Sequence, residues 1–299
     1  EFVSDIFLDS CRRDFTINSI YLNYDGEFYD PHNGRKDLKN KVIKFIGNPK
    51  ERIQEDKLRV LRYFRFLSYY GCKKNNIHKG SMLACLESLS CISSISKERK
   101  SYEFFKLMKG KCVVDVLILM KNKKVLKLII PGIDKIKNSF IKNLGKSKED
   151  KILRISFLLI LARANLDKVR ENLFLNKKEL HNIRLLLKSY KLYEINNIKE
   201  ARLVKYKLGA EASLNLYYLK CLINKKNTRK QIEKTLVSWR PPDFPMDGND
   251  LKKIGIKKGH LLGKVLQKTR AWWIEKDFQP SRKKCLDKSK IVIFNSREL

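Results

Sequence analysis

The residues between positions 12 and 62 include three groups of charged side chains whose types suit a nucleotide ligand. Arginine guanidinium groups match phosphate oxygens, and carboxylates accept hydrogen bonds from hydroxyl and amino groups. A hydrophobic core requires only a periodic apolar pattern, so charges grouped around short strand and turn signals favour a polar ligand. The candidate residues are Arg12, Arg13, Asp14, Asn18, Asp30, Asp37, Glu55, Asp56, Arg59 and Arg62.

The most specific signal among them is the acid–arginine pair formed by Asp56 and Arg59. The pattern of residues 51–70 predicts one amphipathic helix, which would place these side chains one turn apart. A carboxylate accepting from an exocyclic amine, beside an arginine donating to a ring nitrogen, matches the Watson–Crick edges of C and A but not of G and U. Each such contact contributes about 1–3 kcal/mol. The alternative, which spacing alone favours, is a solvated ion pair of Arg59 with Glu55 or Asp56 worth about 0.3–0.5 kcal/mol.

The elements that must position these residues are a hairpin and a series of helices. Residues 19–30 contain two apolar runs around Asp25-Gly26, which predicts a β-hairpin. Residues 42–46 predict a further short strand, and Gly47-Asn48-Pro49 closes it before a helix start. From there on, apolar spacings of three and four predict helices almost throughout, hence a mainly α fold with a small β-containing edge. In the 51–70 helix the apolar stripe consists of Val60, Leu61, Phe64 and Leu67.

Composition points to nucleic acid as the partner. The chain has 66 Lys+Arg against 32 Asp+Glu, a net charge of +34 over 299 residues, which attracts polyanions. Its 7 cysteines include no C-x-x-C spacing, which favours reduced thiols and a cytoplasmic location over disulfides or a zinc site. No apolar run approaches the ~20 residues that span a bilayer, so no membrane partner is expected.

Two adjacent tryptophans near the end of the chain, Trp272 and Trp273, could stack on bases together with Arg270. An adjacent pair on a terminal helix is more often one core residue beside one at the rim, because aromatic burial dominates packing. We expect the core-and-rim arrangement.

Three motifs occur in order: RRDFTIN, then DPHNGRKDL, then IGNPKERIQEDKLRVLRYFRF. Together they resemble the motifs of the bacterial tRNA nucleotidyltransferase and poly(A) polymerase family, which contains the class II CCA-adding enzymes. The resemblance is dense over residues 3–71, continues through SKERKSYEFFKLMKG (96–110), and returns in RPPDFPMDGNDLKKIGIKKGHLLGKVL. Residues 111–237 resemble the family only in being helical and basic.

The resemblance implies four successive parts. Residues 1–48 would be the C-terminal part of an α/β nucleotidyltransferase head, of which a β-hairpin and a short strand remain. Residues 49–110 would form a helical neck with a nucleotide-selecting template, residues 111–237 a helical body, and residues 238–299 a helical tail that binds tRNA. The chain would thus lack the N-terminal catalytic part of the head.

The resemblance also implies roles for the first motif. Arg12 and Arg13 would face the triphosphate, Asp14 would hold a ribose hydroxyl, and Asn18 would support that turn. Without the family context, the same residues are equally well explained as a surface turn with a local salt bridge.

The later motifs would form the template and a hinge. Glu55, Asp56 and Arg59 match the family's amino-acid template for CTP and ATP, and we count Arg62 as nucleotide-binding with them. The head–neck hinge would comprise Asp30, Gly34 and Asp37, with Gly34 providing unusual backbone angles. Ser96 is expected to cap a helix that braces the template.

The implied reaction transfers CMP and AMP from CTP and ATP to the 3′ hydroxyl of a tRNA, aided by Mg²⁺. The family holds the metal upstream of its RRD motif, and the acids of residues 1–11 (Glu1, Asp5 and Asp9) form no Asp-x-Asp pair. No catalytic residue or metal ligand is therefore assigned in this chain. We expect it to be incomplete for catalysis alone, with a separate N-terminal head chain as a candidate partner. The alternatives are a poly(A) polymerase and a noncatalytic tRNA-binding remnant or subunit of a split enzyme.

Overall fold

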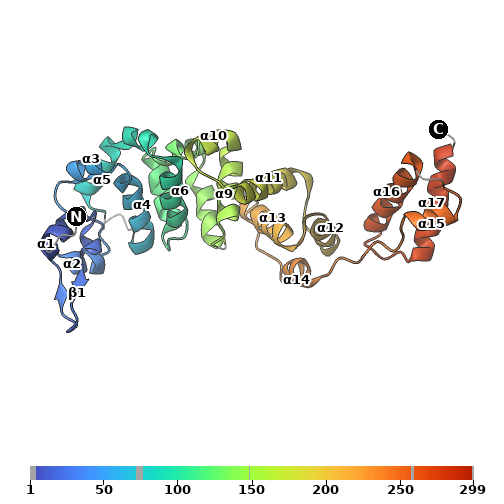
Figure 1. Cartoon of the computed structure of the whole chain (residues 1–299), viewed down its shortest axis with the longest axis horizontal. Helices are drawn as coiled ribbons and strands as arrows, with labels where there is room; N and C mark the ends of the chain where they lie inside the picture. The colour runs from blue at the N-terminus through green and yellow to red at the C-terminus, as the bar shows by residue number, and fades with distance from the viewer. Residues whose placement is uncertain (1–4, 72–76, 148, 257–258, 298–299) are drawn as a thin grey trace. The chain divides into compact units, whose positions relative to one another are not determined.

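The computed structural model describes residues 5–71, 77–147, 149–256 and 259–297 (Figure 1). Its contacts divide the chain into two compact units, Glu1–Lys188 with Tyr218–Lys226, and Ser189–Tyr217 with Asn227–Leu299. The described elements are mainly helices with one two-stranded sheet, which confirms the mainly α fold with a small β edge. The division into head, neck, body and tail stays a prediction.

The hairpin forms where the sequence predicts it. Helix α1 (Ile6–Arg12) and the 3-10 helix η1 (Thr16–Asn18) precede strands β1 (Tyr21–Leu22) and β2 (Phe28–Tyr29). The strands are antiparallel, with Tyr21 opposite Tyr29 and Leu22 opposite Phe28. Gly26 has φ +82°, a left-handed angle that glycine adopts at no steric cost, and this confirms the Asp25-Gly26 turn.

The short strand predicted at 42–46 is reduced to one isolated antiparallel bridge between Phe15 and Phe45. Two backbone hydrogen bonds flank it, from Thr16 N to Lys44 O (3.0 Å) and from Ile46 N to Asp14 O (3.2 Å). The ladder goes no further because η1 begins at Thr16 and turns its backbone away from the pairing direction.

The single helix predicted over 51–70 is wrong. The structure has two helices, α3 (Pro49–Glu55) and α4 (Arg59–Tyr70), separated at Asp56, which is extended at φ −144° and ψ 105°. The Asp56 carboxylate accepts from Leu58 N at 3.1 Å, a local bond that competes with helix continuation. The apolar stripe is confirmed, because all of its members are buried: Val60, Leu61, Phe64 and Leu67.

Helix α4 packs against α6 (Lys97–Leu107) and α7 (Val113–Asn122). Ser96 caps α6 as expected, because its hydroxyl accepts from Arg99 N at 3.3 Å. The other α-helices described in this unit are α2 (Gly34–Lys39), α5 (Lys79–Glu87), α8 (Asn138–Ile141), α9 (Lys151–Ala162) and α10 (Leu166–Asn172).

The second unit contains α12 (Ile198–Leu208), α14 (Lys230–Ser238), α15 (Gly248–Lys253), α16 (His260–Glu275) and α17 (Arg282–Arg297). Helices α11 (Lys177–Leu192) and α13 (Ala210–Ile223) contain residues of both units.

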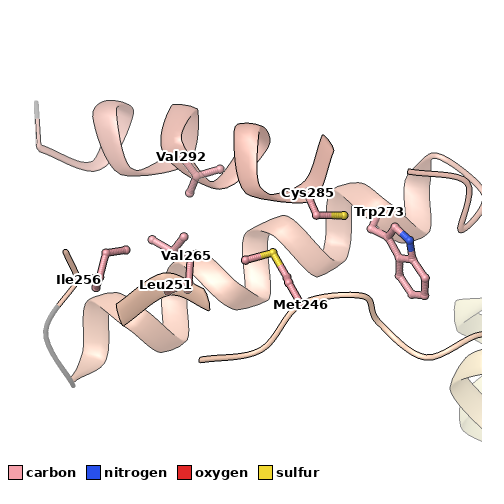
Figure 2. Close-up of a cluster of buried hydrophobic side chains, with 7 residues drawn as sticks. All are labelled: Met246, Leu251, Ile256, Val265, Trp273, Cys285 and Val292. Atoms are coloured by element: carbon pink, nitrogen blue, oxygen red, sulfur yellow. The ribbon is translucent and has the colours of Figure 1, made fainter. Parts of the chain in front are cut away.

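The core of the second unit includes a cluster of side chains from α15, α16, α17 and the segments on either side of α15 (Figure 2). Trp273 is 1% exposed within it, whereas Trp272 is partly buried against it. This confirms the core-and-rim expectation for the pair. The cluster consists of Met246, Leu251, Ile256, Val265, Trp273, Cys285 and Val292.

Candidate functional site

Asp14 is a buried carboxylate at the turn after α1. Its Oδ1 accepts from Phe15 N (3.0 Å) and from the Asn18 side chain (2.7 Å), and its Oδ2 accepts from Arg62 Nε (2.6 Å). Asn18 therefore does support this turn, as expected. The Asp14 side chain is only 6% exposed, and these donors occupy three of the roughly four acceptor positions of a carboxylate.

The backbone of this turn is tied to the helices that follow. The carbonyl of Arg12 accepts from Arg59 Nη2 (3.2 Å), and the carbonyl of Arg13 accepts from Arg52 Nη2 (2.7 Å). The Arg13 guanidinium pairs with Asp9 at 2.8 Å, and this hydrogen bond lowers the pKa of the Asp9 carboxyl. The first and third motifs thus meet, although 39 and 47 positions separate the bonded residues.

Arg59 is held by its neighbours on three sides. Its Nη1 donates to Glu55 Oε2 (2.6 Å) and to the carbonyl of Arg52 (2.8 Å), in addition to the bond to Arg12. The hydrogen bond from Arg59 lowers the pKa of the Glu55 carboxyl, and the positive charge of Arg52 acts in the same direction. The ion pair proposed as the simpler alternative, Glu55 with Arg59, is present, and it fixes the guanidinium.

Asp56 has a different partner. Arg99 Nη2 on α6 donates to both of its oxygens, at 3.0 and 2.9 Å. Within the described residues, Asp56 and Arg59 each pair elsewhere, on either side of the break between α3 and α4. The one-turn helical geometry expected for them is therefore wrong, because the helix ends at Glu55. That Asp56 and Arg59 select the bases C and A by hydrogen bonding stays a prediction.

Glu103, which was not among the residues predicted from the sequence, is a carboxylate on α6 that is only 1% exposed. It lies 3.1 Å from Arg65 Nε and 3.8 Å from Arg62 Nη1, both on α4. Burial raises the pKa of the Glu103 carboxyl, and the charges of Arg65 and Arg62 oppose that rise. A signal existed: Glu103 precedes Phe104 and lies four residues before Leu107, on the buried stripe of α6.

The three residues predicted as a hinge connect α2 to its surroundings. Asp30 accepts from Gly34 N (2.6 Å) and Arg35 N (2.9 Å), and Asp37 accepts from the Thr16 hydroxyl (2.7 Å). The hinge role itself stays a prediction.

The backbone argument for Gly34 is wrong, because the left-handed residue is Asn33 with φ +59°. Glycine is needed at position 34 for close approach: a Cβ there would lie 2.1 Å from the Thr16 carbonyl oxygen.

The described residues contain no group of three or more His, Cys, Asp or Glu side chains that could hold a metal ion. Asp5 caps α1 by accepting from Phe7 N at 2.7 Å, and Asp9 binds Arg13 and the Tyr21 hydroxyl. Glu1 lies outside the described residues. A helix with the length and apolar composition to cross a membrane is likewise not found among those described.

Comparisons with known proteins find similar sequences of tRNA nucleotidyltransferases and poly(A) polymerases along most of the chain. Residues 1–44 match the family model of the poly A polymerase head domain. The chain is 30% identical over 305 residues to the mouse mitochondrial CCA tRNA nucleotidyltransferase 1, which covers 96% of this chain and 67% of that protein. It is 40% identical over 111 residues to the CCA-adding enzyme of Bacillus subtilis, or 37% of this chain and 27% of that enzyme.

Solved structures show the same fold. The CCA-adding enzyme of Bacillus stearothermophilus in complex with CTP has a TM-score of 0.79 at 18% identity, over 99% of this chain and 76% of that one. The Thermotoga maritima CCA-adding enzyme complexed with tRNA has a TM-score of 0.63 at 18% identity, over 96% and 74%.

Proposed function

The chain belongs to the tRNA nucleotidyltransferase and poly(A) polymerase family, and on that basis we propose that it carries the nucleotide-selecting and tRNA-binding parts of a CCA-adding enzyme. Such an enzyme transfers CMP and AMP from CTP and ATP to the 3′ hydroxyl of tRNA and releases pyrophosphate. The relatives that cover nearly all of the chain are named as CCA tRNA nucleotidyltransferases, which supports this reaction.

The observation that carries the proposal is the restrained pair of side chains at the break between α3 and α4. Glu55 and two backbone carbonyls hold the Arg59 guanidinium, so little of its conformational entropy remains to be lost when it donates to a base. Asp56 is held by Arg99 and Leu58 N, and a carboxylate retains acceptor capacity beyond these bonds. A base with an amine beside an unprotonated ring nitrogen, C or A, suits this donor and acceptor.

The remaining nucleotide contacts follow from the first motif. In our proposal Arg12 and Arg13 bind the triphosphate, and Asp14 binds the ribose with Asn18 and Arg62 as its supports. Arg13 would have to exchange its bond to Asp9 for phosphate, a stronger anion. Asp30, Gly34 and Asp37 would form the hinge between this part and the neck.

Nucleotidyl transfer in this family uses divalent metal ions, and we propose Mg²⁺. The N-terminal carboxylates do not fit such a site, because Asp5 caps a helix, Asp9 binds Arg13 and Tyr21, and Asp14 binds three donors. We therefore assign no metal ligand among the described residues of this chain.

We further propose that neck, body and tail bind tRNA largely through phosphate contacts, since the net charge is +34. We also propose a cytoplasmic location, because the 7 cysteines include no C-x-x-C spacing and thiols stay reduced in that compartment; the mammalian relatives are named as mitochondrial.

The test is equilibrium binding of CTP, ATP, GTP and UTP to the chain, followed by extension of a tRNA that lacks its 3′ CCA, alone and with an added head fragment. We expect preference for CTP and ATP, and R59A should lose roughly 5- to 150-fold of it, from about 1–3 kcal/mol per base contact. The control is R170A, which removes an arginine paired with Asp167 on α10.

Absence of both preference and extension would refute the proposal. A ladder of A residues made without CTP would instead identify a poly(A) polymerase, and tRNA binding without any transfer would identify a noncatalytic remnant.

A further inference from the structure

We propose that Glu103 is a positioning residue that makes the site prefer ribonucleotides, acting through Arg62 on Asp14. The inference rests on the proposed function in one respect, the binding of ribose by Asp14. It adds a residue on α6 that contacts no nucleotide in the proposed arrangement.

Glu103 is a buried carboxylate. Its side chain is 1% exposed between Arg62 and Arg65, and its buried Oε2 makes no hydrogen bond within the described residues, although Arg65 Nε is 3.1 Å away. A buried charge with an incomplete set of hydrogen bonds is costly, and an apolar residue of similar size would fill the same space at less cost. Stability therefore does not explain a carboxylate at this position, whereas control of the neighbouring arginines does.

Arg62 lies between two carboxylates, those of Asp14 and Glu103. Its Nε donates to Asp14 Oδ2 at 2.6 Å, and its Nη1 faces Glu103 Oε1 at 3.8 Å. The Arg62 side chain is 29% exposed, so without Glu103 its outer end could turn towards solvent. The attraction of Glu103 keeps the guanidinium plane aligned with Asp14.

The Asp14 carboxylate keeps one acceptor position that its protein partners do not occupy. Its Oδ1 is taken by Phe15 N and Asn18, whereas Oδ2 accepts only from Arg62 among the described residues. The remaining acceptor position is therefore on Oδ2, the atom that Arg62 orients. A ribose 2′-hydroxyl can donate to it, and a 2′-deoxyribose cannot. If Arg62 moves, this position moves with it, and the preference for ribose falls.

The experiment is a titration of the full chain with ATP and with 2′-deoxy-ATP, followed by calorimetry. A hydrogen bond to a charged group is worth roughly 10- to 150-fold in affinity, so we expect the wild-type chain to prefer ATP by about that factor. In E103Q the preference should fall towards unity through weaker ATP binding, with 2′-deoxy-ATP affinity nearly unchanged. The matched control is E98Q, the same substitution at an exposed position of α6, which should keep the wild-type ratio.

A structural role alone would weaken both nucleotides together and leave their ratio intact, which would overturn the inference. E103D keeps the charge but moves it away from Arg62, so its ratio of ATP to 2′-deoxy-ATP affinity should be intermediate. If E103Q does not fold, an unchanged ratio in E103D would also overturn the inference. If the wild-type chain prefers ATP to 2′-deoxy-ATP and the Glu103 variants keep that preference, only the role of Glu103 is refuted. A wild-type chain that does not distinguish the two sugars refutes the ribose role of Asp14 and this inference with it.

Discussion

Trp273 should be the most sensitive single position in the core of the second unit, and W273A tests this. The side chain is 1% exposed and its ring contacts Phe278, Phe244 and Tyr206 at centroid distances of 5.0, 5.3 and 6.2 Å. Truncation of a buried Trp or Phe to Ala costs about 3–5 kcal/mol. Because three aromatic contacts are lost together, we expect a value in the upper part of that range.

The matched control is W272A at the adjacent position. Trp272 is partly buried, and Lys288 Nζ lies 5.8 Å from its ring centroid. Truncation of this partly buried side chain removes less apolar contact than truncation of Trp273, and the lost cation–π contact adds about 0.5–1 kcal/mol. This variant should therefore be affected far less.

The assay is native-state hydrogen exchange, because two compact units make a single unfolding free energy poorly defined. In W273A the protected amides of α16 and α17 should exchange about 1000-fold faster, from roughly 4 kcal/mol at 1.4 kcal/mol per tenfold. In W272A the increase should stay below about tenfold. Equal acceleration in both variants would show that the stability of the cluster in Figure 2 does not follow the difference in burial between Trp273 and Trp272, and would refute this reasoning.

Two further predictions concern local structure. G110A should lower the free energy of unfolding by about 1–3 kcal/mol through overpacking, because a Cβ there would lie 2.5 Å from the Ser68 carbonyl oxygen. G263A, with open space around it in α16, should raise the free energy of unfolding by about 0.5–1 kcal/mol. A higher melting temperature for G110A than for G263A would contradict the packing. Burial lowers the pKa of His78, whose neutral Nδ1 accepts from Ser81 N at the start of α5. Stability from this cap is therefore complete above the unfolded pKa of about 6.5 and is lost as pH falls through the lower folded value. As the pH is lowered from 7.5 to 5, the denaturation midpoint should fall less steeply in H78N than in the wild-type chain, because asparagine caps the helix without titrating. The same pH dependence in both proteins would exclude the effect.

The sequence by itself determined those features that depend on neighbouring residues. Asp25-Gly26 specified the hairpin turn because glycine accepts a positive φ. Pro49 specified the start of α3, where the Asn48 side chain accepts from Lys50 N. Apolar periodicity identified the buried side of α4. The order of the three charged motifs, which no single element requires, identified the family and the residues of the candidate site.

Tertiary structure alone decided how those residues are held. The Asp56 carboxylate is held by Arg99, which is 43 positions away. The requirement for glycine at position 34 comes from the Thr16 carbonyl, and a close approach of this kind has no signature in the sequence.

The role of Glu103 depends on α6 packing against α4, 38 positions from Arg65. Helical periodicity shows that a residue is buried, but it does not show what it is buried against. The energy of a buried charge is set by that partner, and only the folded chain supplies it.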